Sequence, residues 1–269
     1  GAVASQLAAT SDAELLRRVF ADVDVVVVAG DTFARRDHRH LLAILGAAQH
    51  LDLPTYLVNT AIGALEEGHD ILRGLADCTV RDAVSARTLK ALGIGHRQVA
   101  DPVFGAPFGD TARRDFSNHL VVTDCQPSRR VEFTSDLAVV RGAWPGMVAD
   151  YSLDAPGSAL DWTSAVADLG TASAILTGGR AGAALALRAG VPFVALGLEG
   201  EALDFIETLD GYPAGAGDPA RRLDERLAAA IDARAWFAEA AARMATRGPA
   251  DAFSRLRPSM ALAGRDDAW

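Results

Sequence analysis

Uniformly apolar stretches alternate along the chain with stretches in which apolar residues recur every three to four positions. Residues 24–29 (DVVVVA) are almost entirely apolar, as expected of a strand buried on both faces of a parallel sheet. The same reasoning predicts strands over residues 55–58, 78–80 and 98–99, and helices over residues 40–50, 65–75 and 83–92. This order is typical of a parallel α/β unit.

A second series follows a break at residues 101–118, which are rich in proline, glycine and charged residues. It predicts strands over 119–123 and 137–140, a helix over 161–169, a strand–turn–helix–strand unit over 174–196 and a helical segment over 219–247. We therefore expect an α/β fold of two Rossmann-like domains with parallel sheets and a cleft between them. The expected divisions are a first domain at 1–108, a linker at 109–118, a second domain at 119–247 and an irregular tail at 248–269.

Composition excludes several classes of function. The net charge of −9 and the single lysine argue against a nucleic-acid partner. The apolar runs are too short to span a bilayer, and the first residues lack a signal-peptide charge pattern, so we expect a cytoplasmic protein without a transmembrane segment. Cys78 and Cys125 fall in predicted apolar strands, where a thiol usually behaves as a small buried hydrophobe.

The loop at residues 177–182 (TGGRAG) is the strongest candidate for a binding site. It joins a predicted strand to a predicted helix, so the glycines Gly178, Gly179 and Gly182 let the main chain approach a ligand, and the start of the helix favours an anion. Arg180 adds a planar cation suited to phosphate or carboxylate. The alternative is an ordinary tight turn without a ligand.

Polar residues after the strands of the first domain give further candidates, because open α/β sheets bind ligands at their carboxyl ends. Asp31 is a candidate general base, with a helix cap as the alternative. Asn59 and Thr60 are candidates for binding sugar hydroxyls, although a simple turn explains them equally well. Arg81 is expected to meet a ligand, or to form an ion pair with Asp101.

The histidines give one candidate acid or base and no metal site. His69 follows a predicted turn close to the expected cleft, but its acidic neighbours, Glu66, Glu67 and Asp70, equally suggest an exposed start of a helix. No Cys/His cluster has the spacing of metal ligands. We therefore expect neither a metal nor a cofactor.

Four short motifs resemble the polysaccharide pyruvyl transferase family. They are the run 78–89 (CTVRDAVSARTL) with the following LGI and Asp-Pro, the strand and loop DVVVVAGDTF, the strand TYLVNTAIG, and the segment 175–196. The resemblance implies two Rossmann-like domains of the GT-B type, with the acceptor bound by the first domain and the donor by the second. It also implies transfer of pyruvate from phosphoenolpyruvate to a sugar hydroxyl in carbohydrate biosynthesis.

Gly179 and Ala181 stand where that family has an arginine and a histidine, so the resemblance implies a transferase with a changed donor. Two alternatives stay open. One is a GT-B-type glycosyltransferase that uses a nucleotide sugar, with Glu199 or Glu201 binding hydroxyls, and the other is a non-catalytic binding or scaffold subunit. The expected partners are a small-molecule donor and a sugar-like acceptor, and a homo-oligomer is compatible with the sequence.

Overall fold

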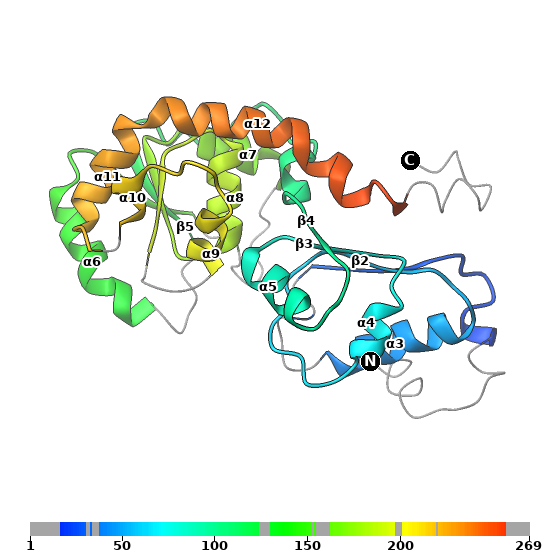
Figure 1. Cartoon of the computed structure of the whole chain (residues 1–269). Coiled ribbons are helices and arrows are strands. Elements are labelled where there is room, and N and C mark those ends of the chain that lie inside the picture. Colours follow the sequence, from blue (N-terminus) through cyan, green and yellow to red (C-terminus); the bar gives the residue numbers. More distant parts are fainter. Residues whose placement is uncertain are drawn as a thin grey trace. The chain divides into compact units, whose positions relative to one another are not determined.

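The computed structural model describes residues 17–30, 33, 38–123, 130–151, 153, 162–196, 201–218 and 220–256. The chain divides into two compact units (Figure 1). The first consists of residues 1–102 together with 250–269, and the second consists of residues 103–249. Each unit holds one four-stranded parallel sheet, which confirms the predicted α/β class with two parallel sheets.

The first sheet has the strand order β1-β2-β3-β4. Its strands are β1 (Val26–Ala29), β2 (Thr55–Thr60), β3 (Asp77–Val80) and β4 (Arg97–Gln98), and its helices are α3 (Arg39–His50), α4 (His69–Arg73) and α5 (Ala83–Ala91). One core cluster joins strand residues such as Leu57 and Val80 to the helix residues Leu45, Leu72 and Leu89. Strands β2 and β3 are buried at every position, although Thr55, Asn59, Thr60, Asp77 and Thr79 in them are polar.

A smaller hydrophobic cluster joins the last described residues to the first sheet. Ala252 and Leu256 pack with Tyr56, Val58 and Val99. Beside this cluster, the buried carboxylate of Asp77 accepts a hydrogen bond from Arg97 at 2.5 Å and another from Arg255 at 3.4 Å. Residues 250–256 therefore belong to the first unit, although they follow the second along the chain.

Helices α3 and α5, and α8 of the second unit, end in one hydrogen-bond pattern. The residue after each C-cap (Asp52, Gly93 and Gly190) has a positive φ between 58° and 69°. Its N–H and the next N–H bond to carbonyls of the last helical turn, for example Gly93 to Lys90 at 3.1 Å and Ile94 to Leu89 at 2.9 Å. This Schellman motif turns the chain from each helix toward the next strand.

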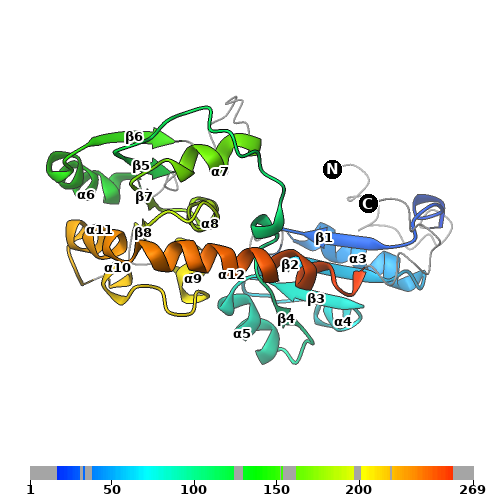
Figure 2. The same cartoon turned by 90° about the horizontal axis from the view of Figure 1, so that it is seen from above.

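The second sheet has the strand order β6-β5-β7-β8, which Figure 2 shows side by side. The strands are β5 (His119–Thr123), β6 (Met147–Tyr151), β7 (Ala174–Thr177) and β8 (Phe193–Ala195). The helices are α6 (Arg130–Ala143), α7 (Trp162–Gly170), α8 (Arg180–Arg188), α9 (Glu201–Glu207), α10 (Ala214–Gly217), α11 (Leu223–Asp232) and α12 (Arg234–Phe253), and a 3-10 turn, η1, covers Pro102–Gly105. The last four residues of α12 belong to the first unit.

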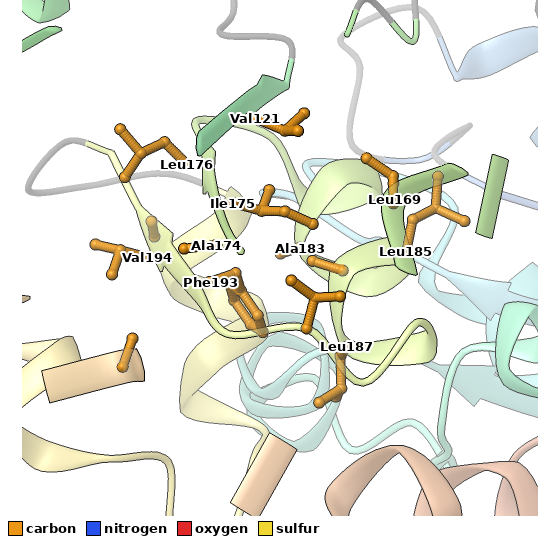
Figure 3. Packing of buried hydrophobic residues seen from close by; sticks show 14 of the residues in the cluster. Val121, Leu169, Ala174, Ile175, Leu176, Ala183, Leu185, Leu187, Phe193 and Val194 are labelled. Atoms are coloured by element: carbon orange, nitrogen blue, oxygen red, sulfur yellow. The ribbon is translucent and has the colours of Figure 1, made fainter. Parts of the chain in front are cut away.

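The core of the second unit surrounds β7. Ile175 pairs with Phe193 in register, and both lie on the side of the sheet that faces α8, together with Ala183, Leu185 and Leu187 (Figure 3). Leu176 and Val194 pair in register and point to the opposite side. Both faces of β7 are therefore buried, and its carboxyl end opens directly onto the loop before α8.

Four details differ from the sequence-based expectations. Strand β1 is not buried on both faces, because Val27 and Ala29 are exposed. Residues 137–140 lie in α6 and do not form a strand; Leu137 packs on the core and Val140 is buried, which is a helical spacing. Residues of the expected linker pack on the second unit, where Phe116 is buried and Asp168 accepts the N–H groups of Arg113 and Arg114. Helix α12 continues to Phe253, beyond the expected start of an irregular tail at residue 248.

No helix among the described residues is long and apolar enough to cross a membrane.

Candidate functional site

The loop between β7 and α8 lies at the carboxyl edge of the second sheet. Three neighbouring strands end there in register, because Thr177 of β7 pairs with Thr123 of β5 and with Ala195 of β8. Gly178 and Gly179 are half-buried, and Ala181 is exposed. The start of α8 is therefore accessible at the edge where parallel sheets bind their ligands.

Thr177 holds this loop in shape. Its Oγ1 donates to the carbonyl of Gly179 at 2.9 Å and accepts the N–H of Gly179 at 3.2 Å. Gly179 is the N-cap of α8, with extended backbone angles and no side chain that could cap the helix. The first bond within the helix runs from the N–H of Ala183 to Gly179.

The N–H groups of Arg180, Ala181 and Gly182 form the first turn of α8. In an α-helix these groups have no acceptor one turn earlier, and they carry the positive end of the helix dipole. Main-chain N–H groups at an accessible helix start bind phosphate oxygens well. The geometry of the loop therefore suits an anionic ligand such as a phosphate.

Gly182 has a packing role that the sequence alone does not show. A Cβ atom at this position would lie 2.3 Å from Oγ1 of Thr123 and 2.3 Å from Oγ1 of Thr177. Both threonines are buried at the ends of their strands. The absence of a side chain at Gly182 lets α8 begin directly against the sheet edge, which fixes the position of its first turn.

Arg180 lies inside the second unit. Only 6% of its surface is exposed, and its guanidinium lies 5.1 Å from the centre of the Phe205 ring in α9. Such a contact is a cation–π interaction, and it is stronger away from water. Arg180 therefore places a permanent positive charge next to the first turn of α8, while its side chain packs against α9.

A second buried arginine lies at the same edge. Arg226 of α11 donates to the carbonyl of Ala195 at 2.9 Å and to the carbonyl of Ala216 at 3.0 Å. Arg226 is not among the site residues predicted from the sequence. A signal for it exists, because Arg226 falls at helical spacing among Leu223, Leu227 and Ala230, on the stripe of α11 that becomes buried.

Burial controls the ionisation of two groups outside the loop. Desolvation raises the pKa of Tyr212 well above its ordinary value, and the positive charge of Arg226 partly opposes this effect. The Tyr212 hydroxyl therefore stays protonated and donates to the carbonyl of Phe193 at 2.6 Å. Desolvation, followed by the charge of Asp77, raises the pKa of the Cys78 thiol to about 12. Cys78 is thus a buried hydrophobe, as expected, and not a nucleophile.

The candidates in the first unit gather at the carboxyl edge of its sheet. Asn59 and Thr60 are the last two residues of β2, and both are buried. Arg81 follows β3 and is half-buried. Asp82 is the N-cap of α5, where its carboxylate accepts the N–H of Ser85 at 2.7 Å and the Ser85 hydroxyl at 2.9 Å, so capping explains this residue.

His69 begins α4 and is half-buried. Its Nε2 lies 3.3 Å from the carbonyl of Leu65, a contact that requires the proton on Nε2. Glu66, Glu67 and Asp70 are exposed, in agreement with the alternative of an exposed start of a helix. Asp31 and Glu199 lie outside the described residues. Among those residues no group of three or more His, Cys, Asp or Glu side chains could hold a metal ion.

No family model matches the chain, and no curated protein is similar to it in sequence. Solved structures are similar to it in fold. The UDP-GlcNAc 2-epimerase from Neisseria meningitidis bound to UDP-GlcNAc matches 97% of this chain and 81% of its own, with a TM-score of 0.60 and 11% identity. The S. aureus MnaA–UDP structure matches 94% and 79%, with a TM-score of 0.58 and 14% identity. A putative UDP-N-acetylglucosamine 2-epimerase from Listeria monocytogenes matches 97% and 78%, with a TM-score of 0.53 and 16% identity.

The expected resemblance to polysaccharide pyruvyl transferases is wrong, and so is the expectation of a transferase. No family model supports it, and the similar structures include UDP-GlcNAc 2-epimerases. The structure gives the physical reason. In the run 78–94, Asp82 caps α5, Leu89 fills the core, and Gly93 with Ile94 forms the Schellman turn. These residues are what a strand–helix–strand unit requires, so they do not identify a reaction.

The fold is therefore that of the GT-B-like UDP-GlcNAc 2-epimerase structures, with two parallel α/β sheets and an accessible helix start at the carboxyl edge of the second.

Proposed function

We propose that this protein binds a nucleoside diphosphate sugar, with the diphosphate held at the start of α8. The observation that carries the proposal is the first turn of α8, whose N–H groups lie at an accessible sheet edge behind a glycine N-cap. Thr177 fixes the loop through Gly179, and Gly182 fixes the helix against the sheet. The anion would therefore meet a preformed site.

The charges near the loop agree with this assignment. Arg180 and Arg226 bring two buried guanidinium groups to the carboxyl edge of the second sheet. Electrostatic interactions are stronger in a buried environment than in water, so these charges favour an anion at the adjacent helix start. Ala181, Gly182 and Ala183 carry no functional group. The start of α8 is therefore suited to binding, and it offers no side-chain acid or base.

The fold supports the choice of ligand class. Among the similar structures, the Neisseria meningitidis protein is bound to UDP-GlcNAc and the S. aureus protein to UDP. Both ligands contain the diphosphate that a helix start recognises. A nucleoside diphosphate sugar is thus the ligand class on which the fold and the loop geometry agree.

Calorimetric titration of the full chain tests the proposal. We expect UDP and UDP-GlcNAc to bind, and uridine, which lacks the diphosphate, to bind at least about tenfold more weakly, since charged hydrogen bonds contribute about 1.5–3 kcal/mol. Equal binding of uridine and UDP, or no binding of UDP, would contradict the proposal.

A matched pair of variants locates the site. Ala181 is the second residue of α8, and Ala235 is the second residue of α12; both are exposed. A carboxylate at this position stabilises either helix through its dipole. We expect Ala181→Asp to weaken UDP binding at least about tenfold through charge repulsion, and Ala235→Asp to leave it unchanged. Equal affinities of the two variants for UDP would place the ligand elsewhere.

A further inference from the structure

The guanidinium of Arg180 lies against a pair of stacked aromatic rings. It is 5.1 Å from the centre of the Phe205 ring in α9, the helix that packs next to α8 (Figure 1). The Phe205 ring is stacked in turn on the ring of Phe104 in η1, with the ring centres 6.3 Å apart and the ring planes 10° from parallel. All three side chains are buried. The charge of Arg180 is therefore held within the second unit by an aromatic surface.

The position of the Phe205 ring is fixed by contacts that do not involve Arg180. The carbonyl of Phe205 accepts the hydroxyl of Thr208 at 2.6 Å and the N–H of Thr208 at 3.0 Å, which closes the end of α9. The offset stack on Phe104 is a favourable arrangement of two rings. The ring therefore sets the position of the guanidinium, and η1 supports the ring.

An aromatic ring holds a cation without neutralising it. The attraction comes from the quadrupole of the ring, which carries no net charge, whereas a carboxylate in the same place would cancel much of the field of the cation. Arg180 is the first residue of α8, and side chains of a helix lean toward its start. Its positive charge therefore adds to the helix dipole at this end of α8, and the interaction with an anion is stronger in buried surroundings than in water.

We infer that Phe205 is a positioning residue for the anion site, because it holds the charge of Arg180 beside the first turn of α8. This inference rests on the proposed function, since it concerns the diphosphate that we assign to α8. Phe205 does not need to touch the ligand. Its effect on affinity should pass through the charge of Arg180 alone, which distinguishes it from a residue that only fills the core.

Three substitutions in the full chain isolate this effect. Phe205→Leu keeps an apolar side chain and removes the ring. Phe237→Leu is the matched control, because it removes another buried ring of the same unit, which packs on Phe193 and Trp236. Arg180→Met keeps a long side chain and removes the charge. UDP is titrated into the wild type, the three single variants and the double variant Arg180→Met/Phe205→Leu.

We expect Phe205→Leu to weaken UDP binding at least about threefold and Phe237→Leu to leave it unchanged, although both should lower the midpoint of thermal unfolding. In the Arg180→Met background, Phe205→Leu should cause no further loss of affinity, because the charge that the ring positions is already absent. In the wild type, the side-chain Nε–H resonance of Arg180 should shift when UDP is added, and less when uridine is added. This last readout requires no variant to fold.

Three results would overturn the inference while leaving the diphosphate site intact. The first is equal affinity of Phe205→Leu and Phe237→Leu for UDP. The second is the same loss from Phe205→Leu with and without the charge of Arg180, which would assign the ring a general packing role. The third is an unchanged Arg180 Nε–H resonance in wild type that has bound UDP. A wild type that does not bind UDP would instead overturn the proposed function, and the inference with it.

Discussion

Gly182 lies so close to Thr177 that a methyl group on its Cα would be 2.3 Å from the Thr177 hydroxyl oxygen. This contact, with an equal one to Thr123, means that the first turn of α8 is seated against the ends of β7 and β5 without any intervening side chain. The hydroxyl of Thr177 is in turn bonded to Gly179. One threonine therefore fixes both the loop and the helix start that we assign to the diphosphate.

The first prediction concerns this packing. Gly182→Ala should lower the free energy of unfolding by about 1–3 kcal/mol, because the added methyl group forces apart elements that are buried and closely packed. Gly142, in α6, is the matched control, since a Cβ atom there meets nothing within 4 Å. Gly142→Ala should be neutral or slightly stabilising, as alanine is the better helix former. Urea unfolding of both variants measures the difference, and equal stabilities would show that α8 is not seated as described.

The second prediction separates the hydroxyl of Thr177 from its shape. Thr177→Val keeps the shape of the side chain and removes both bonds to Gly179. We expect the affinity for UDP to fall at least about fivefold, because the loop is no longer held in its binding conformation. Thr171→Val is the control, because it likewise removes one accepted bond, from the N–H of Phe116, and one donated bond, to the carbonyl of Asp168, in the second unit and before β7. Titration of UDP into both variants should show a loss for Thr177→Val only; equal affinities would mean that the loop needs no such support.

The third prediction concerns Arg180. Because its side chain is buried against Phe205, Arg180→Ala should lower the free energy of unfolding by about 2–4 kcal/mol, through lost packing and the loss of buried polar contacts. Arg243→Ala removes an exposed arginine of the same unit and should change stability by less than about 0.5 kcal/mol. The midpoints of thermal unfolding of the two variants measure this difference. An unchanged unfolding midpoint for Arg180→Ala would show that the guanidinium is available to a ligand instead.

The fourth prediction is a pH dependence that arises from Cys78. Its pKa is raised from 9.0 to about 12 in the folded protein. Between these pH values the unfolded chain loses the thiol proton and the folded chain keeps it, so the unfolded state binds fewer protons and stability falls as pH rises. Below pH 9 this contribution should be constant. Unfolding curves from pH 8 to 11 should therefore show a steeper loss of stability for the wild type than for Cys78→Ala, and parallel curves would contradict the burial of a neutral thiol.

Much of the fold could be predicted from local signals. The fully buried strand β7 begins with the apolar run Ala174 to Leu176, and Gly190 before Val191 marks the end of α8. Residues 137–140 were predicted incorrectly, because a run of four apolar residues fits a strand and a helix equally well.

The site was harder to predict because side-chain direction depends on distant packing. The loop at residues 177–182 is recognisable as a helix start, but the direction of Arg180 is set by Phe205, which lies in another helix. Asn59 is likewise buried with a φ of 50°, and this conformation depends on Thr79 and on a register shift between two strands. The short motifs were misleading because their residues have local structural roles. Asp82 caps the start of α5 and Gly93 follows its end, and such residues occur in the helices of unrelated proteins.

Amide NMR of the full chain can show whether the first turn of α8 holds the diphosphate of the ligand. When UDP is added to ¹⁵N-labelled protein, we expect the largest changes in amide proton shift at Arg180, Ala181 and Gly182, with smaller changes when uridine is added. If UDP binds and these three amides do not move, or move equally with uridine, the diphosphate is not held at α8 and the assignment of the site is wrong.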